Sequence, residues 1–281
     1  MSYLRHWKLP RSPFSITPTG KGVFTGGTVE EALARSDFLI AQGKRLGLVI
    51  GPSGVGKSTF LRYFSKSRSA REPLETLAVI DLRCADRSTV PTRILNGLSA
   101  FQDGTISTQE CWSKINDHLF AESAVGHRTI LLMDNADGIS EEAYHAVSQL
   151  WCSSIRWSML LSVDDESIVD VPRWILDQTD LKIELPRWDL GQTADYFDFA
   201  FQQVGIEDPV FNGQAITRIQ ELGDGIPKKI VQISELALVA GAVRKIQKVT
   251  SELVDQVCEE FTVPVGNKNS TFWANPTLNA G

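Results

Sequence analysis

The sequence predicts an α/β domain, built on a parallel five-stranded sheet with helices on both faces, and a small all-helical domain after it. Five short apolar runs alternate with helical patterns, and continuous apolar strands of this kind are typical of a parallel sheet buried on both faces. After Pro186 the strand pattern stops and only helical patterns follow. With 281 residues, 42% of them hydrophobic and 22% charged, the chain is long enough to bury both cores.

The α/β domain is expected to follow an extended arm. Residues 1–27 are rich in Pro, Gly and Ser, and their scattered aromatic side chains predict an arm that packs on a core. Thr28 and Glu31 form a capping-box pattern, which predicts a helix from there to about Gln42. The α/β core is expected over 28–186. Its strands are predicted at 46–50, 77–82, 128–134, 157–163 and 181–185, and its other helices from about 57 and over 91–101, 108–121 (with a capping-box pattern at Ser107 and Glu110) and 140–151.

The second domain is expected over 187–261. Asp189 to Gln192 can cap a helix that runs to about Val204, and further helical patterns follow. These later helices are predicted over 209–222, 227–241 and 250–261. The last residues, 262–281, carry turn residues without a period, which predicts a flexible tail.

Charge and cysteine usage limit the class of protein. The net charge of −6 argues against a dedicated nucleic-acid binder with a strong basic surface, although it does not exclude a local basic patch. Four cysteines without a CxxC pair indicate reduced thiols in the cytoplasm. The chain contains no apolar run near the ~18 residues of a membrane span and no signal-peptide pattern. We therefore expect a cytoplasmic protein without a membrane span.

A phosphate-binding loop is the strongest motif. GPSGVGKS, residues 51–58, matches G-x-x-x-x-G-K-[ST], with an apolar strand before it and a helix after it. Its glycines let backbone amides turn inward around phosphates, Lys57 would contact the β- and γ-phosphates, and the Ser58 hydroxyl would bind Mg²⁺. The motif predicts a nucleotide as ligand. The expected nucleotide-binding residues of the loop are Gly51, Pro52, Ser53, Gly54, Val55, Gly56, Lys57, Ser58 and Thr59.

A candidate metal-binding strand ends in ILLMDNAD, residues 130–137. Asp134 closes the apolar run, and in a P-loop fold this carboxylate holds Mg²⁺ together with Ser58. Asn135 follows where a Glu would act as general base, and an amide cannot take a proton. Asp137 can turn toward the γ-phosphate, or it can cap the helix that begins near Ser140. The residues alone leave open whether the chain hydrolyses a nucleotide or only binds it.

Four segments together resemble a known family. The chain is similar to the AAA+ ATPase domain of the general secretion pathway protein A (ExeA) type, within the wider group that includes transposition ATPases of the TniB and MuB kind. The resemblance implies a P-loop AAA+ fold with a helical lid, and ATP rather than GTP as ligand. It is carried by SPFSITPTGKGVFTGGTVEEALA (12–34), LGLVIGPSGVGKSTFLR (46–62), GHRTILLMDNADGIS (126–140) and DGIPKKIVQISELAL (224–238).

The chain departs from the family pattern at several site positions. Asn135 replaces the expected Glu and Asp137 the expected Gln. Lys228 stands where the lid motif has an Arg that senses the nucleotide, and it would contribute charge without a bidentate fork. The sensor of the fourth strand falls near Ser162 or Asp164. The transmembrane segment and peptidoglycan-binding module of the family are not expected here, so the secretion role is not inherited with the fold.

The resemblance also implies self-assembly and a trans-acting arginine. In oligomeric ATPases an arginine of a neighbouring copy neutralises charge in the transition state. Arg173 is the first candidate and Arg156 the second, and both can equally be ordinary surface residues. Five basic residues of the second domain can form a basic face on the lid, or they can simply belong to a solvated helix surface. They are Lys228, Lys229, Arg244, Lys245 and Lys248.

Three functions stay open at this point. The first is a Mg-dependent ATPase that couples ATP binding and hydrolysis to conformational change or assembly. The second is a hydrolysis-impaired nucleotide switch or scaffold, which Asn135 favours. The third is a DNA-associated transposition-type ATPase, which the acidic composition does not indicate. The expected ligands are ATP, ADP and Mg²⁺, with a homo-oligomer or an unidentified protein as partner.

Overall fold

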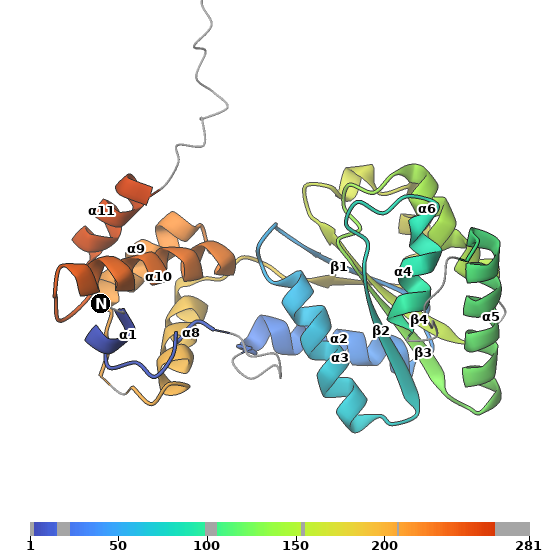
Figure 1. Ribbon diagram of the computed structural model, residues 1–281, viewed down its shortest axis with the longest axis horizontal. Helices are drawn as coiled ribbons and strands as arrows, with labels where there is room; N and C mark the ends of the chain where they lie inside the picture. The colour runs from blue at the N-terminus through green and yellow to red at the C-terminus, as the bar shows by residue number, and fades with distance from the viewer. Residues whose placement is uncertain (1–2, 16–22, 99–105, 153–154, 207, 262–281) are drawn as a thin grey trace, which may run out of the picture.

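The computed structural model describes residues 3–15, 23–98, 106–152, 155–206 and 208–261. Its α/β domain and its helical domain lie side by side, and a short connection after β5 joins them (Figure 1). The sheet has five strands in the order β2-β3-β4-β1-β5, and every pairing is parallel. The predicted fold class is therefore confirmed.

The sheet brings the chemically important residues to one edge. In the parallel register Asp81 lies opposite Asp134, and Gly51 lies opposite Asp164. Because the carboxyl ends of parallel strands meet at the same edge, these residues and the loop after Gly51 share that edge. The strands are β1 (Leu46–Gly51), β2 (Glu75–Asp81), β3 (Arg128–Asp134), β4 (Trp157–Asp164) and β5 (Leu181–Glu184).

Helices cover both faces of the sheet. Along β3, Ile130 and Leu132 pack into a cluster with Phe64, whereas the alternate residues Leu131 and Met133 belong to the cluster on the other face. The first face carries α2 (Gly27–Ala41) and α3 (Lys57–Arg71). The second carries α4 (Thr89–Gly97), α5 (Thr108–Ala124), α6 (Glu141–Ser148) and α7 (Arg173–Asp177), with short 3₁₀ turns η1 (Gln149–Cys152) and η2 (Ile168–Asp170).

The helical domain has its own apolar core, and the N-terminal arm is part of it. Trp7 donates from Nε1 to the Leu238 carbonyl at 2.8 Å, and Phe14 packs 6.0 Å from Tyr196 between ring centroids. The arm is not wholly extended, since it opens with the short helix α1 (Tyr3–His6), which lies beside α10 (Figure 1). The other helices are α8 (Leu190–Gln202), α9 (Gly213–Gly223), α10 (Pro227–Val243) and α11 (Ser251–Phe261).

The predicted caps are right at two helices and wrong at one. Capping boxes start α5 at Ser107 and α8 at Asp189, as expected. At α2 the N-cap is Gly26, and Thr28 lies inside the helix. Its hydroxyl accepts a hydrogen bond from Gln192 Nε2 of α8 at 3.1 Å, so a tertiary contact uses the group that the capping box would need.

The predicted tail, 262–281, lies outside the described residues, so its flexibility stays a prediction. Within the described ranges, none of the helices combines the length and the apolar character that a membrane span requires. The isolated bridge between Phe211 and Val249 is the one strand-like pairing recorded for the described part of the helical domain.

Candidate functional site

The loop over 51–58 joins the end of β1 to the start of α3. Gly54 and Gly56 have φ angles of 83° and 111°, which side chains of L-residues rarely adopt, so glycine is required at both positions. Gly56 is the N-cap of α3 and has no side chain to occupy the first N–H groups. The loop and the helix dipole therefore offer an anion site in the form that the motif predicts.

Lys57 is folded into this loop. It is 8% exposed, and its Nζ donates to the carbonyls of Gly51 at 2.7 Å and Pro52 at 3.2 Å. The same ammonium makes an ion pair with the carboxylate of Asp164 at the end of β4. A phosphate that binds Lys57 must therefore compete with Asp164.

Asp134 is buried and held in one orientation. Its carboxylate is 3% exposed and accepts at Oδ1 from the Ser162 hydroxyl at 2.7 Å and from the Asn135 amide N–H at 3.0 Å. Ser162 is itself fully buried. Ser58, in the first turn of α3, lies on the same edge of the sheet. A fixed carboxylate and a hydroxyl are the oxygen ligands that Mg²⁺ prefers.

Asn135 turns away from the loop toward strand β2. Its φ angle is +56°, a left-handed conformation that Asn tolerates better than most residues. The side-chain Nδ2 donates to Asp81 Oδ1 at 2.9 Å. Burial alone would raise the pKa of Asp81, but hydrogen bonds from the Arg83 amide and from Asn135, with the charges of Arg83 and Arg93, bring it below its ordinary value.

Asp137 does not cap α6. Ser140 is the N-cap of that helix and accepts from the Ala143 N–H at 3.2 Å, so this alternative for Asp137 is wrong. Asp137 Oδ1 instead accepts from the backbone N–H of Asp164 at 3.2 Å, which ties the loop after β3 to the end of β4. Whether Asp137 serves as a base stays a prediction.

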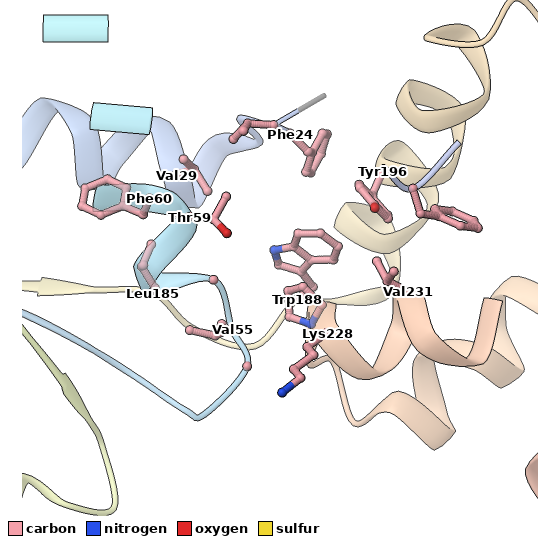
Figure 2. A pocket seen from close by; sticks show the side chains of 15 residues that line it. Phe24, Val29, Val55, Thr59, Phe60, Leu185, Trp188, Tyr196, Lys228 and Val231 are labelled. Atoms are coloured by element: carbon pink, nitrogen blue, oxygen red, sulfur yellow. The ribbon is translucent and has the colours of Figure 1, made fainter. Parts of the chain in front are cut away.

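A cavity of about 270 Å³ lies where the arm, the loop and the helical domain meet. Figure 2 shows Phe60, Val55 and Val29 on one side, and Trp188, Tyr196 and Val231 on the other. The ring centroids of Trp188 and Tyr196 are 5.0 Å apart, and those of Phe24 and Trp188 are 5.6 Å apart. Such a wall suits a flat, largely apolar ligand group. The lining residues are Phe14, Val23, Phe24, Val29, Gly54, Val55, Gly56, Thr59, Phe60, Leu185, Trp188, Tyr196, Pro227, Lys228 and Val231.

Sequence reasoning found only part of this cavity. Gly54, Val55, Gly56, Thr59 and Lys228 were expected to bind nucleotide, while the aromatic wall was not assigned a role. The available signal was the aromatic-rich arm, together with Trp188 and Tyr196 at the start of the helical domain.

The helical domain touches the loop directly at the start of α10. The Lys228 N–H donates to the Gly54 carbonyl at 3.2 Å. A Cβ on Gly54 would lie 3.0 Å from Ile226 Cγ2 and 3.1 Å from Lys228 Cβ. The loop and the start of α10 are therefore in direct contact.

The basic residues of the helical domain fall into two groups at opposite ends of α10. Lys228 and Lys229 lie at the start of α10, whereas Arg244, Lys245 and Lys248 follow its end. The helix has 17 residues and is about 25 Å long, so its length separates the two groups. Whether the two groups form one basic face of this domain stays a prediction.

The two candidate arginines lie at different places. Arg173 is exposed at the start of α7 and lines a surface hollow with Glu141, the first residue of α6. Arg156 precedes β4 and lies at the amino edge of the sheet, which is opposite the loop after β1. Arg173 thus stays the better candidate, and its action on a neighbouring copy stays a prediction.

Comparison with known proteins confirms the resemblance. Residues 40–167 match the AAA domain family. The chain is 24% identical over 265 residues to general secretion pathway protein A of Aeromonas hydrophila. This match covers 88% of the chain and 46% of that protein, so the chain spans about half the length of this relative.

Solved structures confirm the AAA+ fold. Cdc6p from Pyrobaculum aerophilum superposes with a TM-score of 0.70 at 14% identity, over 91% of this chain and 72% of that one. The Aeropyrum pernix ORC1 protein, described in complex with DNA, gives 0.70 at 15% identity over 89% and 69%. The Thermotoga maritima RuvB Holliday junction branch migration motor gives 0.55 at 12% over 89% and 73%. At these identities the likeness establishes the fold alone.

Proposed function

We propose that the chain binds Mg-ATP between its phosphate loop and its helical lid, and that binding and hydrolysis of ATP change how the lid sits on the core or drive assembly. The observation that carries this proposal is the 270 Å³ cavity, because the anion-binding loop, the aromatic wall and the start of α10 meet there. The phosphates would lie on the loop with Lys57, and the adenine ring would enter the cavity that Trp188 and Val231 line.

The available oxygen ligands fit Mg²⁺. This ion keeps several waters and is usually bound through one or two protein groups together with substrate phosphates. Ser58 and Asp134 would provide those two groups. Over the described residues, no group of three or more His, Cys, Asp or Glu side chains could hold a metal by itself, in keeping with an ion that arrives with its nucleotide. When bound, the metal would neutralise charge on the phosphates.

A larger side chain in the cavity tests whether the adenine ring binds there. Val231 and Val239 both lie on α10, but only Val231 lines the cavity, while Val239 is 44% exposed elsewhere. We expect Val231→Trp to weaken Mg-ATP binding by roughly tenfold or more, because the ring would lose its contact area. Val239→Trp, the matched control, should bind as wild type does. Titration calorimetry with both variants measures the difference.

The result for Val231→Trp is interpretable only if the fold survives. Thermal unfolding of both variants should therefore accompany the titration. Equal Mg-ATP affinity of a folded Val231→Trp variant and of Val239→Trp would mean that the adenine ring does not bind in this cavity. This result would contradict the proposal.

Asp164 should act as a brake on nucleotide binding. Its carboxylate holds Lys57, which also donates to two backbone carbonyls. We expect Asp164→Asn to tighten ATP binding by roughly tenfold, since a hydrogen bond to a charged group is typically worth about 1.5–3 kcal/mol and the phosphates would no longer compete with it. Asp165→Asn, at the exposed next position, is the control. Weaker binding by Asp164→Asn would instead assign Asp164 a direct role in holding the nucleotide.

A nucleotide switch without hydrolysis is the second candidate. The Asn135 amide favours it, because this side chain cannot accept a proton and donates to Asp81 instead. Phosphate release by the wild-type protein separates the two functions. Mg-ATP binding without release, with release restored by Asn135→Glu, would favour the switch.

DNA binding is not part of the proposal. Two similar solved structures are described with DNA, but a similar fold does not imply that this chain binds the same ligand. The net charge of −6 and the separation of the basic residues along α10 give no support for DNA binding.

We also propose a cytoplasmic location, because all four cysteines are free thiols: Cys84, Cys111, Cys152 and Cys258. Cell fractionation can test this location.

A further inference from the structure

The position after Asp134 lacks a carboxylate, but a carboxylate lies next to it in space. Asp81 is the last residue of β2, directly opposite Asp134 in the sheet register. The Asn135 side chain donates to Asp81 Oδ1 at 2.9 Å. Two neighbouring strand ends thus carry an amide and a carboxylate in hydrogen-bond contact, with the acid on β2 and the amide on β3.

We propose that Asp81 is the general base of this site and that Asn135 is the positioning residue that holds it. This inference rests on the proposed function, because it names the proton acceptor for the hydrolysis of ATP. Asp81 would accept the proton of the attacking water, and Asn135 would hold the carboxylate in place through its hydrogen bond to Oδ1.

The contacts of Asp81 leave one oxygen available. Oδ1 accepts from Asn135 Nδ2 and from the Arg83 N–H, each at 2.9 Å. Arg93 anchors the same turn by donating to the carbonyls of Asp81 at 2.6 Å and Arg83 at 2.8 Å. No hydrogen bond to Oδ2 is recorded from the described residues, and the side chain is exposed. A carboxylate that is fixed through one oxygen, in an exposed side chain, can accept a proton at the other.

The other carboxylates at this edge are committed to other contacts. Asp134 is 3% exposed and is the expected metal ligand. Asp164 holds Lys57, and Asp137 accepts from the Asp164 N–H at 3.2 Å. Among these four carboxylates, Asp81 is the one with a recorded hydrogen bond to the side chain of Asn135, the residue that stands where a base is expected.

The proton and bond changes balance without a further reactant. The water oxygen forms a bond to the γ-phosphorus, and the bond from phosphorus to the bridging oxygen breaks, so ADP leaves with that electron pair. The water proton passes to Asp81 Oδ2 and then to solvent.

A purely structural role for Asp81 predicts a different outcome. Its bond from the Arg83 N–H is that of an Asx turn, which an Asn side chain can also make. Asp81→Asn therefore keeps the turn and removes only the base. We expect phosphate release to fall by about 10²–10⁴-fold, while the affinity for Mg-ATP and the unfolding temperature stay at wild-type values.

Exchange of the two side chains provides the rescue. The double variant Asp81→Asn with Asn135→Asp restores the pair with the acid on β3, and Asp tolerates the left-handed backbone of position 135. We expect it to recover a large part of the lost phosphate release, which a turn-forming role would not explain. Asn135→Ala alone should lower release without changing Mg-ATP affinity.

The outcomes separate this inference from the proposed function. Wild-type release by a folded Asp81→Asn variant, with loss in Asp137→Ala, would overturn the inference in favour of Asp137. Mg-ATP binding by wild type without any phosphate release would also overturn it, and the chain would then be a switch. Failure of the wild-type protein to bind Mg-ATP would overturn the proposed function itself.

Discussion

Replacing Lys57 with Ala should abolish tight Mg-ATP binding. The ammonium is the buried cation of the phosphate loop, at 8% exposure. Truncating one partner of a buried, hydrogen-bonded charge pair costs about 2–5 kcal/mol, so we expect a loss of affinity of roughly 30-fold or more. Titration calorimetry with wild type and Lys57→Ala measures this loss, and phosphate release should disappear with it.

The control must account for the ion pair that Lys57 makes. Its removal leaves the Asp164 carboxylate beside the loop, where it would repel phosphates for a second reason. The double variant Lys57→Ala with Asp164→Asn removes that repulsion. It should still bind far more weakly than Asp164→Asn alone. Wild-type affinity in Lys57→Ala would mean that the loop is not the phosphate site.

Replacing Asp134 with Asn should uncouple the site from Mg²⁺. Asn keeps an oxygen that can accept from the Ser162 hydroxyl and the Asn135 N–H, so the local packing is retained. The negative charge that holds the metal is lost. We expect phosphate release to fall by roughly 10²–10³-fold, the size of one lost electrostatic contact in a transition state. Affinity for ATP should no longer rise when Mg²⁺ is added.

The matched control for Asp134→Asn is Asp165→Asn. Both positions lie at the same edge of the sheet, but Asp165 is exposed and accepts from the Glu166 N–H only within its own turn. It should keep the Mg²⁺ dependence of ATP affinity. If Asp134→Asn keeps it as well, the metal is held by other groups and the assignment of Asp134 is wrong.

The core elements were predictable because burial repeats along the sequence. The central strands β1, β3 and β4 are buried apolar runs, whereas the edge strand β5 alternates apolar and charged residues, and each strand was predicted within a few residues of its bounds. The helix over Arg173–Asp177 was not predicted, since five residues are too few for a helical period to show. The cap at Thr28 failed because its hydroxyl bonds to Gln192, a residue far along the chain.

The site was predictable only where it depends on local backbone geometry. The loop over 51–58 could be recognised because its glycines and Lys57 are adjacent in sequence. The cavity could not, because Phe24 and Trp188 come together only through the packing of the arm on the lid. The contact between Asn135 and Asp81 was missed for a similar reason, since it depends on which strand lies beside β3.

A crystal structure with Mg²⁺ and a non-hydrolysable ATP analogue would show whether ATP binds between the phosphate loop and the helical domain. We predict that Lys57 Nζ leaves Asp164 for the β- and γ-phosphates, and that the adenine ring lies in the cavity that Trp188 and Val231 line. The start of α10 should move with the loop, because the Lys228 backbone N–H donates a hydrogen bond to the Gly54 carbonyl. A nucleotide bound elsewhere, with Lys57 still paired to Asp164, would show that the phosphate loop is not the binding site.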